Sequence, residues 1–482
     1  MTARQVVVIG GGLAGVTAAI GLREAGFDVT LLEARPRLGG AASSFARGDL
    51  TIDNGQHVFL RCCTSYQELL ARLGVSDLVT MQERFDVTVL SPHGRARLRR
   101  TALPGPLHMG RALTGYRLLP LAERLKVARA ALALRSLDPA DPAIDGVPLG
   151  AWLASKGQSE RARRVLWDLF IVSALNIGGD EASLALSATV IQMALLGKKD
   201  AADIGMAAAP LGDLHGRAAA DLLGTLGAQI RLATKAAAVE RLPGGGFRIG
   251  LTGSGTGQQD ADGAGPAADG PAGPALLADG VVLAVPPGQA ARLAGAAGLE
   301  GAGRWADLGA SPIVNVHVVY DRQVTSLPFA AAVDSPVQWV FDKTRPAGLA
   351  AGQYLAVSLS AADTYVDIPA ASLRQQFLPA LERIFPAAAG ARVTDFFVTR
   401  ERRATFRQAP GIGALRPGTA TAVPGFVLAG AWTDTGWPDT MEGAVRSGQR
   451  AAEELTRWLA SQPAPSGAGR LEAATARTGA PS

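Results

Sequence analysis

The sequence contains very little cysteine, few aromatic residues and no long apolar run. Its two cysteines, Cys62 and Cys63, are adjacent, so no disulfide framework can form and a reducing, cytoplasmic compartment is expected. No CxxC or HExxH motif occurs and the five histidines are scattered, so the sequence predicts no metal site. No stretch of about 20 apolar residues is present, so we do not expect the chain to cross a membrane.

Basic charge is modest and unclustered. The net charge is +5, six of the 47 basic residues are lysines, and no block of basic residues marks a nucleic-acid-binding surface. We therefore expect no nucleic-acid partner, and the sequence leaves the oligomeric state open. The chain has 482 residues, which is too many for one ordinary hydrophobic core, so two domains are expected.

The apolar pattern alternates between two kinds of segment along the chain. Buried-strand runs with glycine-rich turns, typical of a nucleotide-binding domain, occupy 1–75, 225–290 and 415–460. Mainly helical periodicity fills 76–224, and an antiparallel sheet with helices is predicted over 291–414. Composition predicts a flexible insertion at 253–275 and a disordered tail at 461–482. The pattern thus indicates an α/β, discontinuous nucleotide-binding domain with an inserted α+β substrate domain.

A glycine-rich motif directly follows the strand-like run 6–9. Gly10, Gly12 and Gly15 satisfy GxGxxG, and Glu33 lies 18 residues after the last glycine. The glycines permit a tight turn and close approach of backbone N–H groups to a pyrophosphate. The helix N-terminus favours the anion, and the carboxylate can accept from ribose hydroxyls. This combination predicts a dinucleotide-binding βαβ unit.

The residues after Glu33 narrow the dinucleotide. Arg35, Arg37, Gly39 and Gly40 form an Arg-x-Arg-x-Gly-Gly segment, which can wrap pyrophosphate and adenosine and which an ordinary NAD-binding fold has no reason to carry. Here the chain resembles the glutathione-reductase-type FAD proteins, specifically the amine oxidase and phytoene desaturase superfamily. The resemblance implies a Rossmann-like FAD-binding domain and an amine-oxidase-like substrate domain.

Two further segments extend this resemblance. Residues 425–434 resemble the superfamily's closing strand, whose acidic residue lies near FAD, and 440–445 begin a helix expected to point at the flavin. Gly443 in that first turn predicts that something approaches closely, because helix interiors penalise glycine. The turn Asp53-Asn54-Gly55-Gln56-His57 resembles the one that runs beside the isoalloxazine ring. The cofactor-binding residues implied by the resemblance are Gly10, Gly12, Leu13, Ala14, Gly15, Glu33, Ala34, Arg35, Gly39, Gly40, Gly55, Gln56, His57, Ala236, Gly430, Asp434, Thr440 and Met441.

The family can be narrowed by two strings. Asp-Asn-Gly-Gln-His, together with Ala-Gly-x-Trp-Thr-Asp-Thr-Gly-x-Pro-x-Thr-x-Glu-Gly-Ala-Val-x-Ser-Gly over 429–448, resembles the squalene-associated FAD-dependent desaturases. These are the hydroxysqualene dehydroxylases of bacterial hopanoid synthesis. The similarity covers nearly the whole chain outside the insertion and the tail. One departure is Asn176-Ile177-Gly178-Gly179, where a Pro-containing turn is expected after the asparagine.

The resemblance implies reductive removal of the hydroxyl of hydroxysqualene to give squalene. Such chemistry requires a dry apolar channel, a proton for the leaving water and tolerance of developing positive charge. His57, Asp439 and Glu442 are the polar groups expected near the flavin, and they are the candidate proton donors. A C30 isoprenoid resides in the bilayer, and the Leu/Arg-rich segment 95–126 is a candidate for peripheral docking on the inner membrane; an ordinary solvated helical layer fits the pattern equally well.

Two other functions stay open. A carotenoid or phytoene-type desaturase would oxidise rather than reduce and would need a similar substrate domain. A non-redox isoprenoid carrier would share the fold, but the intact Gly-Gly after Arg37 and the intact Trp432-Thr433-Asp434 argue against a carrier, which need not retain a flavin site. Amine oxidation is disfavoured because the chain has only five tyrosines and no evident aromatic-cage sequence.

Overall fold

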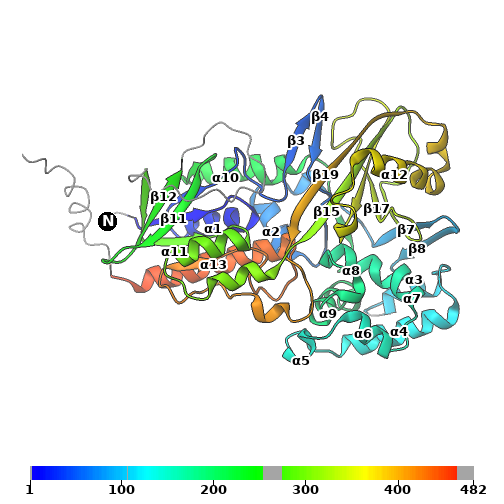
Figure 1. Ribbon diagram of the computed structural model, residues 1–482, viewed down its shortest axis with the longest axis horizontal. Helices are drawn as coiled ribbons and strands as arrows, with labels where there is room; N and C mark the ends of the chain where they lie inside the picture. The colour runs from blue at the N-terminus through cyan, green and yellow to red at the C-terminus, as the bar shows by residue number, and fades with distance from the viewer. Residues whose placement is uncertain (1–2, 106, 253–273, 464–482) are drawn as a thin grey trace, which may run out of the picture.

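The computed structural model describes residues 3–105, 107–252 and 274–463. The predicted insertion at 253–275 and the predicted tail at 461–482 lie almost wholly outside the described residues. Figure 1 shows two regions side by side: one around α1 and α13, the other around the sheet containing β15 and the helices α3 to α9.

The first region is built on a five-stranded sheet in the order β10-β2-β1-β14-β20, and all its pairs are parallel. Its strands come from the beginning, middle and end of the chain, which confirms the predicted discontinuous α/β domain. They are β1 (Gln5–Ile9), β2 (Asp28–Leu32), β10 (Gln229–Arg231), β14 (Gly280–Leu283) and β20 (Phe426–Leu428).

Both faces of this sheet are covered, which explains why its central strands are mostly apolar. On one face Val6 and Val8 pack with the helices α1 (Leu13–Glu24), α13 (Met441–Ser461) and α10 (Ala218–Thr225). On the other face Val7 and Ile9 pack with α11 and a small antiparallel sheet. These elements are α11 (Pro287–Ala296), β11 (Lys235–Arg241), β12 (Phe247–Thr252) and β13 (Ala275–Ala278).

The second region contains a seven-stranded sheet in the order β19-β15-β18-β17-β16-β7-β8. Its pairs are antiparallel, as predicted, except that β16 runs parallel to β7 through Ala331 and Val89. That pair exists because a hairpin from the mainly helical segment 76–224 adds two strands, which apolar periodicity missed. The strands are β7 (Asp86–Ser91), β8 (Gly94–Arg99), β15 (Ser311–Tyr320), β16 (Phe329–Ala332), β17 (Trp339–Asp342), β18 (Gln353–Leu359) and β19 (Val393–Thr405).

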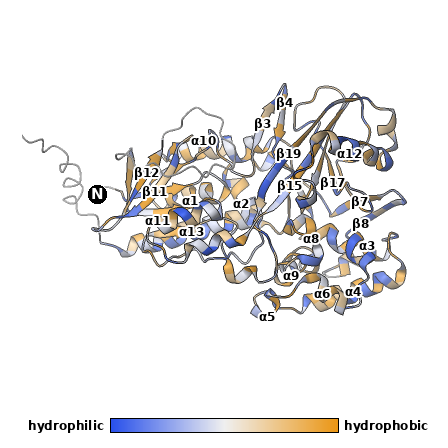
Figure 2. Ribbon diagram, viewed as in Figure 1, coloured by the Kyte–Doolittle hydropathy of each residue, from blue (hydrophilic) through white to orange (hydrophobic). Residues whose placement is uncertain are grey.

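Helices cover this sheet from two sides. Helix α12 (Ala370–Ile384) packs on the face formed by Val314, Val316 and Val318 of β15. A group of helices lies below the sheet in Figure 1, and Figure 2 shows hydrophobic segments along several of them. They are α3 (Gly110–Thr114), α4 (Leu121–Arg135), α5 (Pro142–Asp145), α6 (Leu149–Ser155), α7 (Glu160–Ala162), α8 (Asp168–Leu175) and α9 (Leu184–Ile191).

Asn176 ends α8 in the left-handed conformation, with φ of 51°. Its amide nitrogen donates to the Ser311 carbonyl and to Thr405 Oγ1, each at 3.0 Å, and its Oδ1 accepts from the Ala361 N–H at 2.7 Å. These bonds tie the helix end to the sheet. An asparagine is well suited to this position, so the turn forms without the proline expected after it.

Short elements join the two regions. Strands β5, β9 and β6 form a small antiparallel sheet beside helix α2, and β3 and β4 form a hairpin. Their bounds are β3 (Ser44–Arg47), β4 (Leu50–Asp53), β5 (Val58–Leu60), α2 (Thr64–Arg72), β6 (Val79–Met81) and β9 (Ile204–Ala207). In the described part of the chain, no helix is long and apolar enough to span a bilayer, and no His/Cys/Asp/Glu cluster is suited to hold a metal ion.

Candidate functional site

Two of the three glycines of the N-terminal motif lie where any side chain would collide. Gly10 has φ of +110°, and a Cβ there would strike the Ala284 carbonyl oxygen; a Cβ on Gly15 would strike the Gly10 carbonyl oxygen. Gly12 has open space instead, with Gly40 Cα as the nearest atom, 3.8 Å from a built Cβ. Two glycines therefore permit the tight turn and the helix packing, and Gly12 leaves backbone exposed to an approaching ligand.

The Gly39-Gly40 turn packs directly on this loop. The Gly39 N–H donates to the Gly11 carbonyl at 2.9 Å, and a Cβ on Gly40 would lie 2.8 Å from Gly12 Cα. The two glycine segments predicted to wrap one pyrophosphate are therefore in contact. A bulkier residue at either turn would separate them.

Glu33 is fixed at the end of β2. Its Oε2 accepts from the Gly11 N–H and its Oε1 from the Arg35 N–H, each at 2.7 Å. The Thr234 N–H donates to the Glu33 carbonyl at 2.9 Å, and two residues later Ala236 is buried in β11. The carboxylate, the glycine loop and the start of β11 thus share one corner, where the sequence places the adenosine end of a dinucleotide.

The C-terminal segment closes the other side of the sheet. Gly430, with φ of +139°, lets the Trp432 indole fold back, because a Cβ on Gly430 would lie 2.6 Å from Trp432 Cδ1. The indole N–H then donates to the Val285 carbonyl at 3.0 Å, and the Gly430 N–H donates to Ser447 Oγ at 2.8 Å. The Trp-Thr-Asp string is thereby held between β14 and α13.

Helix α13 begins at a satisfied N-cap. Thr440 Oγ1 accepts from the Gly443 N–H at 3.2 Å, and Met441 is the first helical residue. The close approach expected at Gly443 is real, but its source is the chain itself, since a Cβ would lie 2.6 Å from the Pro438 carbonyl oxygen. A second tight contact is at Gly448, where a Cβ would collide with the Ala14 carbonyl of α1.

Sequence reasoning missed Arg416, which is buried beneath this segment. Its guanidinium donates to the carbonyls of Ala431, Trp432, Thr433 and Trp437. Burial lowers the pKa of Arg416 from its ordinary value, and the carboxylate of Asp434 opposes this. No local pattern marks it in a chain with 41 arginines among 47 basic residues; its role follows only from contacts made across the fold.

Asp53 of the Asp-Asn-Gly-Gln-His turn makes a buried ion pair that crosses between the two regions. Its Oδ2 lies 2.9 Å from Lys343 Nζ, directly after β17, and the side chains are 3% and 12% exposed. Asp53 Oδ1 also accepts from Ser44 Oγ at 2.7 Å and from the Leu211 N–H at 2.9 Å. Lys343 is a second residue that the sequence analysis did not single out.

One cavity of about 80 Å³ lies beside this ion pair and is lined by Asp53, Lys343, Gln56 and His57. Its remaining wall is largely apolar and comes from the start of β5, from β9 and the residues after it, and from the β16–β17 region. These residues are Val58, Met206, Ala207, Leu211, Pro328, Phe341 and Asp342. Gln56 Nε2 is buried without a hydrogen-bond partner. Burial lowers the pKa of His57; the carboxylate of Asp53 opposes this, and the ammonium of Lys343 adds to it. The imidazole is therefore neutral near pH 7.

The other two candidate proton donors do not line this cavity. Glu442 is buried, and its carboxylate accepts from the Ser65 and Tyr66 N–H groups at the start of α2 and from Arg446 Nε at 2.7 Å. Asp439 Oδ2 accepts from the Phe406 N–H at 2.9 Å, and burial raises the pKa of this half-buried carboxyl to about 6. Glu442, although it belongs to α13, thus caps the N-terminus of α2.

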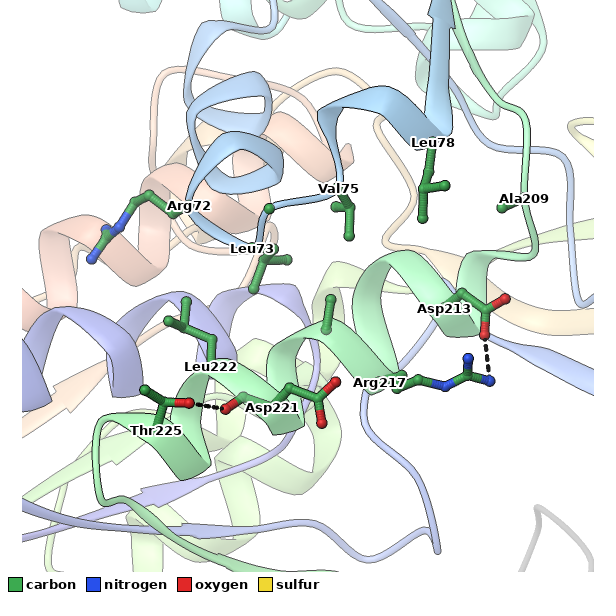
Figure 3. A pocket seen from close by; sticks show the side chains of 12 residues that line it. Arg72, Leu73, Val75, Leu78, Ala209, Asp213, Arg217, Asp221, Leu222 and Thr225 are labelled. Carbon is green, nitrogen blue, oxygen red and sulfur yellow. Dashed lines mark hydrogen bonds and ion pairs between the residues drawn. The ribbon is translucent and has the colours of Figure 1, made fainter.

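A wider hollow of about 500 Å³ lies away from these groups. Figure 3 shows it between the end of α2 and helix α10, beside the helical turn 212–217 in which Asp213 pairs with Arg217. None of the predicted cofactor or catalytic residues lines it. Volume alone would therefore misplace the functional site.

The arrangement fits an extended dinucleotide with a redox-active ring. The open glycine surface and the fixed carboxylate of Glu33 suit its phosphate and ribose groups. At the other end, the unpartnered amide of Gln56 is a buried donor beside the turn that the sequence places next to the ring. Reactive chemistry at that end would take place in the small cavity between the two regions.

Relatives of the chain agree with this reading. The family model of flavin-containing amine oxidoreductases matches residues 13–456. Hydroxysqualene dehydroxylases of Sinorhizobium fredii and Rhodopseudomonas palustris are each 30% identical to the chain, covering 93% of it and 98% of their own length. A probable zeta-carotene desaturase of Synechococcus elongatus is 24% identical over 94% of the chain and 98% of its own length.

Solved structures share the fold at lower identity. Cyclohexylamine oxidase from Brevibacterium oxydans superposes with a TM-score of 0.68 at 20% identity, covering 95% of this chain and 100% of that one. A putative protoporphyrinogen oxidase from Exiguobacterium gives 0.68 at 19%, covering 95% and 99%. The predicted fold and cofactor are thereby confirmed, and the carrier alternative loses its support. The chain belongs to the flavin-containing amine oxidoreductase family, together with the hydroxysqualene dehydroxylases, and is an FAD-dependent oxidoreductase.

Proposed function

We propose that the protein removes the hydroxyl group of hydroxysqualene reductively, giving squalene for hopanoid synthesis. The observation that carries this proposal is the 30% identity to two hydroxysqualene dehydroxylases over 93% of the chain. The largely apolar cavity beside the flavin-side turn supports it, because an isoprenoid alcohol needs an apolar site with a few polar groups at one end.

Reduced FAD, when bound, supplies the hydride that replaces the hydroxyl. The chain must supply the proton that lets the hydroxyl leave as water. Of the three donors proposed from the sequence, only His57 lines the cavity, and burial keeps it neutral. The Lys343 ammonium, held by Asp53 at 2.9 Å, carries a proton into the same cavity. We therefore add Lys343 to the candidates and assign Glu442 a positioning role through α2 and Arg446.

Aromatic side chains adjoin the apolar wall. The rings of Phe329, Trp339 and Phe341 stack on β16 and β17 with centroids 6.2–6.3 Å apart, and Phe341 also lines the cavity. Aromatic faces attract cations without offering a nucleophile. This wall suits the positive charge that develops as an allylic hydroxyl departs.

Product analysis tests the proposal. The protein, reduced anaerobically in D₂O, is mixed with hydroxysqualene, and the extract is analysed by gas chromatography and mass spectrometry. Squalene carrying one deuterium is expected, because the flavin hydrogen exchanges with solvent before transfer. If reduced protein with fully occupied flavin sites formed no squalene, the assignment would be refuted.

A carotenoid desaturase is the second candidate, supported by the relative at 24% identity. The two reactions run in opposite redox directions, so they require opposite flavin states. Oxidised protein incubated with phytoene or zeta-carotene would gain a longer conjugated chromophore under this alternative. Under the dehydroxylase proposal, that absorbance change is not expected.

A membrane contact is proposed through helix α4 and its neighbours. Periodicity places leucines on one face of α4, and that face is the exposed one: Leu121, Leu125 and Leu132 are 55–60% exposed, while Val127 and Leu134 pack inward. Residues 107–135 contain six basic residues and one acidic residue. Exposed leucines among arginines suit an anionic lipid surface such as that of the inner membrane. Other exposed apolar residues nearby in the sequence are Leu103 and Leu107.

Vesicle flotation tests this contact. The protein should float with vesicles containing phosphatidylglycerol at low salt, and the variant L121S/L125S/L132S should lose that association. Leu277, which is 50% exposed on β13 in the other region, provides the matched control L277S. If the triple variant floated as well as the wild type, α4 would not be the contact.

A further inference from the structure

Strand β15 has one apolar face and one polar face, and neither reaches solvent. Val314, Val316 and Val318 face α12, whereas Asn315 and His317 lie on the opposite side and are fully buried. A strand with such alternation normally turns its polar side to water. Here the polar side meets the Asp-Asn-Gly-Gln-His turn instead, because Asn315 Nδ2 donates to the Asn54 carbonyl at 3.3 Å.

A chain of neutral hydrogen bonds continues from this contact. Thr399 Oγ1, opposite Asn315 on β19, also donates to the Asn54 carbonyl at 3.3 Å and bonds His317 Nε2 at 3.0 Å. His317 Nδ1 bonds the Tyr354 hydroxyl at 2.7 Å. Burial lowers the pKa of His317 to about 3, so this network carries no charge near neutral pH.

One atom of the network is left over. Asn315 Oδ1 is buried and has no hydrogen-bond partner, whereas both ring nitrogens of His317 and the hydroxyls of Thr399 and Tyr354 are bonded. A buried acceptor without a donor is costly and uncommon in folded proteins. The amide nitrogen of Asn315 is used locally by the Asn54 carbonyl, but no described group donates to its oxygen. The Oδ1 atom is therefore a candidate for contact with a bound molecule.

Asn315 does not itself line the 80 Å³ cavity, but it lies beside the turn whose Gln56 and His57 do. A Cβ built on Gly55 would be 3.4 Å from His57 Nε2 and 3.8 Å from Asn315 Nδ2. The imidazole and the carboxamide therefore flank the same side of Gly55. Gln56, the next residue, presents the unpartnered donor described above. An acceptor and a donor without partners thus occur within one turn and the strand packed against it.

We propose that Asn315 is a ligand-contacting residue of the redox site: its Nδ2 positions the Asn54–Gly55 turn, and its Oδ1 accepts a hydrogen bond from the bound molecule. The shared chemistry is an N–H or O–H donor, which either the flavin ring or the alcohol substrate can provide. A hydrogen bond from the substrate rests on the proposed function, whereas a hydrogen bond from the flavin ring rests only on FAD binding. The reduced flavin ring carries N–H donors that the oxidised ring lacks, so an acceptor facing the ring favours the reduced state.

The test uses the FAD-loaded full chain. N315L removes both polar atoms at similar volume, and N315T removes the carboxamide acceptor but retains a hydroxyl donor and a β-branched shape suited to a strand. T399V is the matched control, because it removes a bond to the same Asn54 carbonyl at the same 3.3 Å and leaves Asn315 intact. Midpoint potentials are measured by spectroelectrochemistry without substrate, and KM and kcat are measured with hydroxysqualene.

A flavin contact predicts that both Asn315 variants shift the ratio of reduced to oxidised flavin about tenfold toward the oxidised form, equivalent to about 30 mV for a two-electron couple. T399V should leave the potential unchanged. A substrate contact predicts an unchanged potential and a roughly tenfold higher KM in the same variants. FAD-replete Asn315 variants with wild-type potential and KM would overturn the proposal, as would T399V shifting the potential equally. If the wild type does not convert hydroxysqualene, the potential measurement still decides the flavin arm.

Discussion

Replacement of Lys343 by methionine tests the ion pair that joins the two regions. The substitution K343M keeps an unbranched side chain of nearly the same length but leaves the Asp53 carboxylate, 3% exposed, without its cation. Breaking a buried pair in this way costs about 3–5 kcal/mol when nothing else compensates the charge. Asp53 retains bonds from Ser44 Oγ and the Leu211 N–H, so we expect about 2–3 kcal/mol, measured by urea denaturation followed by tryptophan fluorescence.

A double-mutant cycle shows whether the loss belongs to the pair. D53N removes the charge that K343M strands, so the double variant D53N/K343M should be more stable than the sum of the single effects allows. We expect a coupling free energy of about 1.5 kcal/mol or more. Additive effects, with a coupling below about 0.5 kcal/mol, would refute the reasoning that these groups compensate each other. K343R, which retains a cation that cannot give up its proton, should preserve much of the stability but lower kcat if Lys343 is the acid.

Three further substitutions probe other contacts. G448A sets a methyl group against the Ala14 carbonyl and 2.8 Å from Thr17 Cβ, so it should lower the free energy of unfolding by about 1–3 kcal/mol and weaken FAD binding. The control G224A has open space around it and should leave the stability unchanged or raise it by about 0.5–1 kcal/mol. Urea denaturation and FAD titration compare the two variants. In R416K, the lysine ammonium cannot reach all four carbonyls, so FAD binding should weaken about tenfold in a fluorescence titration. Unchanged affinity would show that the 431–437 loop keeps its conformation without these hydrogen bonds. His317 stays neutral when folded, with a pKa of about 3, but takes up a proton near pH 6.5 when unfolded, so its contribution is present above pH 6.5 and is lost as the pH falls. The stability advantage of the wild type over H317N should therefore shrink by about 1.4 kcal/mol per pH unit between pH 6 and 4, and a constant difference in the denaturation profiles would contradict this assignment.

The sequence predicts the nucleotide-binding unit well because its tight turns require glycine at particular positions. Gly10 and Gly15 are needed where a side chain would strike a carbonyl, and such needs appear as glycines at fixed spacing. The ends of β2 and α4 coincide with the ends of their apolar patterns for a related reason, since a continuous periodic pattern stops where the element stops. The hairpin of β7 and β8 was missed because it is a short insertion in a mainly helical segment, and its place in the sheet depends on β16, more than 200 residues away.

The face of a helix is harder to predict than its existence. The spacing of leucines in α4 predicts a helix, and the usual inference is that the leucine face packs inward. Leu121 and Leu125 are instead about 60% exposed, and the inward face is formed by Val127, Ala130 and Leu134. A single sequence cannot distinguish a core from a lipid surface, because both reward the same apolar stripe.

The candidate redox site, which is the cavity beside the Asp-Asn-Gly-Gln-His turn, has a second half that could not be found from sequence. The Asp-Asn-Gly-Gln-His turn is visible as a string of five residues, but Lys343 and Asn315 belong to the other region and carry no local motif. Each becomes meaningful only through a partner: Lys343 through the buried carboxylate of Asp53, and Asn315 through the carbonyl of Asn54. Two polar side chains, one on β15 and one directly after β17, thus meet successive residues of one turn. The proposals for Lys343 and Asn315 therefore both depend on contacts between the turn and the second region, which no local sequence pattern records.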